Sequence, residues 1–169
     1  MTAEEGASYG EQLIEAARRN NTDLFEDLQK ETTDLAELIN TATDPLGNYA
    51  LHLAAFNGSY EMLDHLLDVE GVEVDPINRV YKDTPLHSAV RYAVNEPEHG
   101  AFLAEMLIDA GADPTIKNKD GKKAIDLADE SNQQLIDILQ GAELAREVPI
   151  EELDQPETME GEDSGEESE

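Results

Sequence analysis

LHLAAFNG, residues 51–58, is the stretch of sequence that decides the fold. Its beginning returns as TPLHSA at residues 84–89 and as AIDLA at residues 124–128, and a degenerate copy, LIEAARRN, occupies residues 13–20. Counted between their first large apolar residues, the four copies lie 38, 35 and 39 residues apart. Self-similarity of this kind is typical of a repeat architecture, so the sequence predicts a unit of about 33 residues enlarged by loop insertions.

A second apolar run follows each copy, with members three and four residues apart. This spacing indicates an amphipathic helix, so each copy predicts a pair of helices. Thr84 is suited to cap the helix that Pro85 begins, and Gly111 is suited to the left-handed position that closes a helix. The second runs contain Leu24, Phe25 and Leu28; Met62, Leu63, Leu66 and Leu67; Leu103, Met106, Leu107 and Ile108; and Leu135, Ile136, Ile138 and Leu139.

Four short motifs give the copies a family likeness: TPLH at residues 84–87, LHLAA at 51–55 with Gly58, GADP at 111–114 and NKDG at 118–121. In these motifs the chain resembles the ankyrin repeat family over about residues 11–140. The resemblance implies an all-α ankyrin-repeat solenoid of about four helix-turn-helix repeats, joined by β-hairpin-like loops and followed by a disordered acidic C-terminal tail.

The copies depart from the family pattern in the third repeat. Lys82 stands where the pattern has glycine, so the tip of this loop is expected to be irregular. The six residues Val94–His99 look like an insertion between the two helices of the repeat. Because proline breaks a helix interior, Pro97 is expected to leave a protruding loop there.

The charge of the chain restricts its partners. The 169 residues include 40 acidic and 11 basic residues, a formal net charge of −29. This charge disfavours direct binding of nucleic acid and favours basic proteins or basic segments as partners. The sequence shows neither a membrane-spanning apolar run nor a secretory signal, so we expect no membrane partner and a cytoplasmic and/or nuclear location.

Charge and apolar content divide the chain into three parts: a flexible leader at residues 1–10, an ankyrin repeat domain at 11–140 and an acidic, mostly disordered tail at 141–169. Residues 143–169 carry 12 acids and one base, Arg146. Two roles of the tail stay open, shielding a basic client or only keeping the chain soluble. DSGEES at residues 163–168 resembles a phosphodegron, which makes Ser164 and Ser168 candidate phosphosites.

No residues form a recognisable catalytic, cofactor or metal motif. His52 and His87 fall within the repeat signature, where we expect them to bond loop backbone between repeats. The chain has no cysteine, which excludes disulfides, thiolate metal sites and a cysteine nucleophile. The glycines lie at repeat turns and not in a phosphate-binding loop. We therefore predict a protein that is not an enzyme and needs no cofactor.

The predicted partner surface is the concave side, which ankyrin proteins present through their loop tips and first helices. Transferred by repeat register, it comprises Arg18, Arg19, Leu46, Asn48, Phe56, Asn57, Val80, Tyr81, Asp83, Arg91, Tyr92, Lys119, Asp120, Lys122 and Glu130. Exposed aromatic residues beside arginine are the composition of an interface hot spot. The alternative is that Tyr81 and Tyr92 support the irregular third repeat. The acidic excess is expected on the convex side and in the tail.

These features predict a monomeric, protein-binding adaptor. A short ankyrin stack with an acidic tail is similar to a fungal ankyrin-repeat escort of a basic small-subunit ribosomal protein. That similarity implies an escort or chaperone for a basic client, such as a ribosomal protein or a histone. The alternative is a regulatory or inhibitory subunit of a signalling enzyme or transcription factor, because small ankyrin inhibitors of kinases have a similar size.

Overall fold

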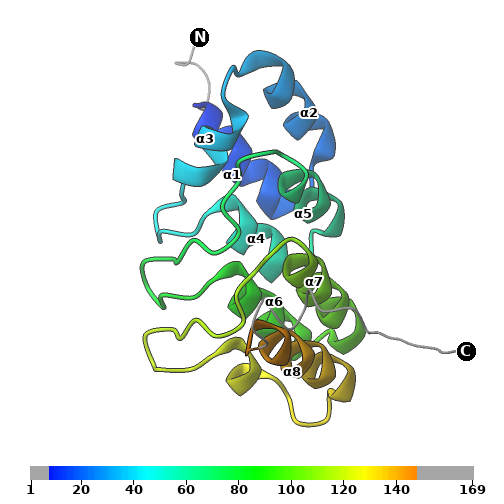
Figure 1. Cartoon of the computed structure of the whole chain (residues 1–169). Coiled ribbons are helices and arrows are strands. Elements are labelled where there is room, and N and C mark those ends of the chain that lie inside the picture. Colours follow the sequence, from blue (N-terminus) through cyan, green and yellow to red (C-terminus); the bar gives the residue numbers. More distant parts are fainter. Residues whose placement is uncertain (1–7, 148–169) are drawn as a thin grey trace, which may run out of the picture.

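The computed structural model describes residues 8–147, whose helices stack in one column from the N-terminus to the C-terminus (Figure 1). Within these residues, the one pairing between extended segments is an isolated antiparallel bridge from Thr43 to Tyr49. The predicted all-α fold is confirmed. The elements are α1 (Tyr9–Arg19), α2 (Thr22–Glu31), α3 (Leu35–Thr41), α4 (Ala50–Phe56), α5 (Tyr60–Leu67), α6 (Pro85–Ala93), α7 (Pro97–Asp109), the 3-10 turn η1 (Ala124–Leu127) and α8 (Gln133–Glu147).

The helices form two layers. α1, α4 and α6 pack against one another in chain order, and α2, α5, α7 and α8 lie along one side of them. Three long loops extend from the opposite side of the column (Figure 1). They are called the second, third and fourth loops, after the repeat that each begins, and comprise residues 43–49, 77–84 and 115–123. Because each unit contacts only its neighbours, the three loop tips form one continuous edge. Among the described residues, no helix is long and apolar enough to cross a membrane.

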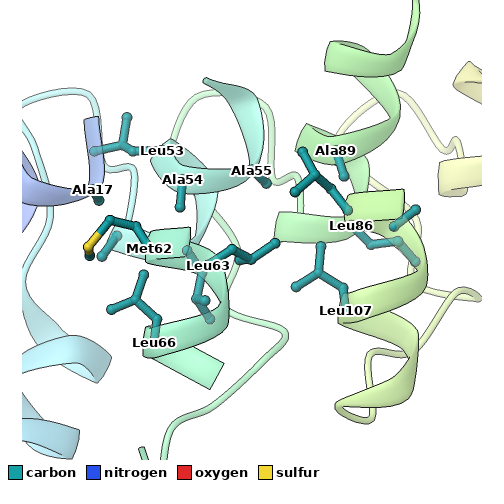
Figure 2. Packing of buried hydrophobic residues seen from close by; sticks show 14 of the residues in the cluster. Ala17, Leu53, Ala54, Ala55, Met62, Leu63, Leu66, Leu86, Ala89 and Leu107 are labelled. Carbon is teal, nitrogen blue, oxygen red and sulfur yellow. The ribbon is translucent and has the colours of Figure 1, made fainter. Parts of the chain in front are cut away.

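Small residues on the first helices let the two layers approach closely. Ala54 and Ala55 of α4 are both fully buried, as are Met62, Leu63 and Leu66 of α5. Figure 2 shows these side chains gathered between the helices of one repeat, next to the core of the following repeat. Burial of such apolar side chains stabilises a fold by about 1.5–3 kcal/mol each, so the core specifies the stacking.

Ser8 and Glu11 set the start of α1. Ser8 Oγ accepts a hydrogen bond from Glu11 N at 3.1 Å, and Glu11 Oε1 accepts one from Ser8 N at 3.0 Å. This capping box satisfies two N–H groups that a helix end leaves open. The helix therefore begins at Tyr9. Residues 1–7 of the expected leader lie outside the described residues.

Pro97 begins a helix and does not break one. α6 ends at Ala93 and α7 begins at Pro97, so the expected six-residue protruding loop is wrong. At the first helical position the missing N–H of proline costs no hydrogen bond, and its fixed φ is already helical. Gly100 then lets α7 lie against α6, because a Cβ there would fall 2.3 Å from the Cβ of Ala93.

The irregular tip of the third loop is confirmed. Lys82 adopts a left-handed φ of 58°, as glycine does at the same place in the neighbouring loops. A backbone hydrogen bond joins Asn78 N to Asp83 O in this loop, but Asn118 N to Lys122 O in the next. The third loop therefore encloses one residue more than the fourth.

Both ends of the stack differ from the predicted pattern of simple helix pairs. At the N-terminal end, α3 follows α2 and was not expected. At the C-terminal end, the first helix of the fourth repeat is reduced to the four residues of η1. The terminal units of a solenoid have a neighbour on one side only, which relaxes the requirement for a regular helix pair.

The last helix crosses the expected start of the acidic tail. α8 continues to Glu147, so residues 141–147 are helical. Two ion pairs hold this part of the helix, Lys123 Nζ to Glu143 Oε1 at 2.9 Å and Arg146 Nε to Asp113 Oδ1 at 3.2 Å. The rest of the expected tail lies outside the described residues.

Candidate functional site

Two buried histidines connect neighbouring loops. His52 Nδ1 accepts a hydrogen bond from Tyr49 N at 3.1 Å, so Nε2 carries the proton and donates to Asp83 O at 2.8 Å. His87 repeats this arrangement one unit further on, with Nε2 bonded to Lys122 O at 2.9 Å. The predicted role of both histidines in bonding loop backbone is confirmed.

Burial keeps these imidazoles neutral. Desolvation lowers the pKa of His52 and of His87 below the ordinary value of 6.5, although hydrogen bonds to backbone carbonyls oppose the effect. A neutral ring can donate from one nitrogen and accept at the other, which is what this arrangement requires. Both nitrogens of each ring are occupied by the fold, so these histidines position loops.

Asp83 is the centre of a polar network under the loop tips. Its carboxylate accepts hydrogen bonds from Arg91 Nε at 2.7 Å and from Asn118 Nδ2 at 3.0 Å. Asn78 Oδ1 accepts from Asp83 N at 2.9 Å, and Asn78 Nδ2 donates to Asn48 Oδ1 at 2.9 Å. The network runs through all three loops. A buried network whose members are satisfied rigidifies its surroundings, so the loop tips form a preorganised surface.

A cleft of about 250 Å³ opens above this network, between the second and third loops. Leu46, Phe56 and Tyr81 stand around it with exposed fractions of 59%, 55% and 52%. The guanidinium of Arg91 lies 5.1 Å from the centre of the Tyr81 ring. The cleft is lined by Leu46, Asn48, His52, Leu53, Phe56, Asn78, Tyr81, Asp83, Ser88 and Arg91. Large apolar side chains that stay exposed around a rigid polar floor are suited to receive an apolar side chain of another molecule.

The cleft unites part of the predicted partner surface. Six predicted residues line it: Leu46, Asn48, Phe56, Tyr81, Asp83 and Arg91. Val80 and Asn57 are exposed and adjoin the lining residues Tyr81 and Phe56 in sequence. Asn57 Nδ2 donates to Leu53 O. Lys119, Asp120 and Lys122 are exposed on the fourth loop, and Glu130 is exposed beyond η1.

Other predicted residues lie apart from the cleft. Arg18 and Arg19 are on α1, where both form ion pairs with Glu15. Tyr92 is half-buried, and its ring meets His99 edge-on at 5.5 Å. A Cβ at Gly58 would lie 2.3 Å from the Tyr92 hydroxyl, so this ring packs between repeats. The packing favours the structural interpretation of Tyr92.

Four lining residues were not predicted as partner contacts: His52, Leu53, Asn78 and Ser88. Leu53 precedes Phe56 by three residues on α4, and Ser88 precedes Arg91 by three on α6. Residues three apart share a helix face, so this spacing could have indicated them. Asn78 could not have been found in this way, because it reaches the cleft only through loop folding.

Charge is separated between the two layers. The helices α1, α4 and α6 contain the acids Glu11 and Glu15 against the bases Arg18, Arg19 and Arg91. The outer helices carry the exposed acids Asp23, Glu26, Asp27, Glu31, Glu61, Asp64, Glu98, Glu105, Asp109, Asp137 and Glu147, here called the acidic face. For the described residues, the predicted acidic excess on the convex side is confirmed.

Residues 8–147 contain no group of three or more acidic or histidine side chains placed to hold a metal ion. Burial raises the pKa of Asp75, whose carboxylate accepts hydrogen bonds from Asp113 N at 3.1 and 3.2 Å. This contact joins the residues that precede the third and fourth loops, and it lies outside the cleft. The candidate phosphosites Ser164 and Ser168 lie outside the described residues.

Comparisons with known proteins agree with the repeat architecture. The sequence matches the family model described as ankyrin repeats (3 copies) over residues 13–118. It is 52% identical over 147 residues to ankyrin repeat-containing protein YGL242C of Saccharomyces cerevisiae, an alignment covering 83% of this chain and 81% of the relative. It is 31% identical over 139 residues to the E3 ubiquitin-protein ligase hecd-1 of Caenorhabditis elegans, covering 76% of this chain but 4% of that protein.

Proposed function

The chain belongs to the ankyrin repeat family, and on that premise we propose that it is a non-enzymatic adaptor that anchors a partner protein in the cleft. One observation carries the proposal. Leu46, Phe56 and Tyr81 remain exposed around a concavity whose floor is fixed by buried hydrogen bonds. Preorganised apolar pockets of this kind lower the entropy lost on binding, which is why interfaces use them for their anchors.

The test begins with partners recovered by affinity purification of the tagged chain and identified by mass spectrometry. Phe56→Ala should weaken binding of the main partner by about 2 kcal/mol, roughly 30-fold in Kd. The matched control is Phe102→Ala, because Phe102 is also an exposed phenylalanine (43%) but lies on α7 in the outer layer. Equal affinity of the Phe56 variant and the unaltered chain would reject the cleft as the anchor.

We further propose that the client is basic, such as a ribosomal protein or a histone, and that the chain escorts it. The acidic face supports this proposal, because its carboxylates would attract a basic surface and raise the association rate. Binding should then weaken steeply between low and physiological ionic strength. Glu98→Gln with Glu105→Gln should weaken it at low salt, whereas Asp120→Asn, on a loop tip, should not.

A regulatory or inhibitory subunit of a signalling enzyme or transcription factor is the second candidate. The nearly balanced charge of α1, α4 and α6 favours it, since a partner held mainly by the apolar cleft needs no opposite charge. In that case affinity would change little with salt, while Phe56→Ala would still abolish most binding. Recovery of a kinase or transcription factor as the main partner would favour this candidate.

We also propose a cytoplasmic and/or nuclear location, which imaging of the tagged chain would test. Phosphorylation at Ser164 and Ser168 is proposed as a signal for degradation. An unchanged half-life of the variant with Ser164→Ala and Ser168→Ala would reject that role.

A further inference from the structure

The loop tips are basic although the chain as a whole is strongly acidic. The loop edge, defined here as residues 43–49, 77–84 and 115–123, presents five exposed bases: Arg79, Lys82, Lys117, Lys119 and Lys122. Only Lys119 and Lys122 of these are among the predicted partner contacts. Repeat register could have placed the others, since each lies within a loop between two helical copies.

The carboxylates of the loop edge do not cancel this charge at the surface. Asp44 is 9% exposed and accepts hydrogen bonds from Leu46 N at 3.0 Å and from Asn48 N at 2.8 Å. Asp83 is 1% exposed and is satisfied by the network described above. Asp120 is the one exposed acid within the loop edge. A binding partner therefore meets mainly cations.

Contacts between neighbouring loops hold the loop tips side by side. Arg79 donates to Pro45 O of the second loop, and Lys119 N donates to Tyr81 O of the third loop at 2.9 Å. Adjacent repeats stack at about 8–10 Å, the usual distance between packed helices. An extended chain rises about 3.3 Å per residue, so one repeat corresponds to about three residues of a bound strand.

We infer that the segment entering the cleft is an acidic segment of a partner protein. It would place one large apolar side chain among Leu46, Phe56 and Tyr81, with carboxylates at about every third position facing the loop edge. The inference rests on the proposed binding function of the cleft and adds the chemistry of its occupant. A client that is basic overall would thus turn its basic surface to the acidic face and an acidic segment to the loop edge.

The probe is a fluorescein-labelled peptide of about twelve residues, with one phenylalanine followed by glutamate at every third position and serine between them. Binding to the full chain is measured by fluorescence anisotropy at low salt. The glutamate peptide should bind at least tenfold more tightly than the same peptide with glutamine. Equal binding of the two peptides would overturn the inference.

Charge variants place the peptide on the protein. Lys119→Glu should weaken the glutamate peptide about two- to fivefold, as expected for a partly exposed ion pair, and adding Lys82→Glu should weaken it further. Lys30→Glu makes the same change of charge on α2, in the outer layer, and should alter affinity less than twofold. An equal effect of Lys30→Glu and Lys119→Glu would show that only net charge matters, and would refute the site.

Two further variants distinguish a failure of the acidic occupant from a failure of the cleft itself. If Phe56→Ala weakens the peptide but the lysine changes do not, the cleft stands and the acidic occupant is wrong; if none of them matters, the cleft itself is wrong. A full-length chain with amides at the ten acids of residues 148–169 tests for occupation by the chain itself. Unchanged peptide affinity supports a partner segment, and a gain of more than tenfold would assign the loop edge to residues 148–169.

Discussion

α6 of the third repeat and η1 of the fourth occupy equivalent places in the stack. α6 has nine residues and begins at Pro85, and the Thr84 side chain caps it by accepting a hydrogen bond from His87 N. η1 has four residues and follows Lys123, whose side chain accepts no such hydrogen bond. α6 packs against α4 on one side and η1 on the other. The same register position therefore forms a full helix where neighbours bury both sides and a short turn near the end of the stack.

The residue at the third helical position also differs between the fourth repeat and the two before it. His52 and His87 each bond the loop of the next repeat, while Asp126 takes this position in η1 and accepts a hydrogen bond from Lys123 N at 2.9 Å. Within the described residues, no loop of a further repeat follows η1, so a histidine at this position would have no neighbouring repeat loop to bond. Helix stability in a solenoid thus comes from interfaces between repeats more than from the local sequence of each repeat.

The anchor residues of the two repeats test this comparison most strongly. Leu86→Ala should lower the free energy of unfolding by about 2–5 kcal/mol, because Leu86 is fully buried between neighbouring repeats. Ile125→Ala, at the same register position in η1, should cost less than half as much, since Ile125 is half-buried. Urea unfolding followed by circular dichroism gives both values. Equal losses would mean that η1 contributes as much as α6.

Two glycine substitutions compare the middle of the stack with its C-terminal end. Gly58→Ala should cost about 1–3 kcal/mol, because φ is +69° and the new Cβ would meet the Tyr92 ring between repeats. Gly141→Ala in α8 should instead stabilise the protein by about 0.5–1 kcal/mol, since nothing lies within 4 Å of the new Cβ and alanine favours helix. A loss of stability at both positions would contradict the loose packing inferred for the end of the stack.

The central histidines predict a pH dependence. Burial lowers the folded-state pKa of His52 and His87 below 6.5, so the unfolded chain binds more protons between the folded and unfolded values. Their stabilisation is complete above about pH 6.5 and declines as pH falls through this window. Tm should therefore be lower at pH 5.5 than at pH 7.5. His87→Gln should flatten this dependence, and an equal Tm at both pH values would rule out the mechanism.

The smallest effect is expected at the irregular loop tip. Lys82→Gly removes a left-handed strain of about 1–2 kcal/mol but increases the entropy of the unfolded chain by about 0.5–1 kcal/mol. The net result should be a gain of up to about 1 kcal/mol, measured by urea unfolding. Gly121→Ala, at the equivalent place with φ +74°, should lose a similar amount. Destabilisation by Lys82→Gly would show that the lysine side chain stabilises its loop.

The predictable parts of the fold rest on interactions within a few residues. The start of α6 follows from Thr84 and Pro85, and the histidine roles follow from the repeat signature. The role of Pro97 is not predictable in this way, because proline breaks a helix interior but favours a helix start, and its neighbours in sequence do not distinguish the two. The length of α8 depends on contacts between distant residues, because Lys123 pairs with Glu143 and Arg146 pairs with Asp113.

The sequence by itself determined the repeat unit, the all-α class and the helix ends that carry their own caps, because hydrogen bonds and apolar periodicity within one unit are local. Only the tertiary structure decided where the cleft lies, since Leu46 and Tyr81 come from different repeats and meet through stacking. It also decided that the exposed surface of the loop edge is positively charged. The same composition exposes bases at the loop tips and buries Asp44 and Asp83 beneath them, because burial, unlike net charge, depends on the neighbouring repeat.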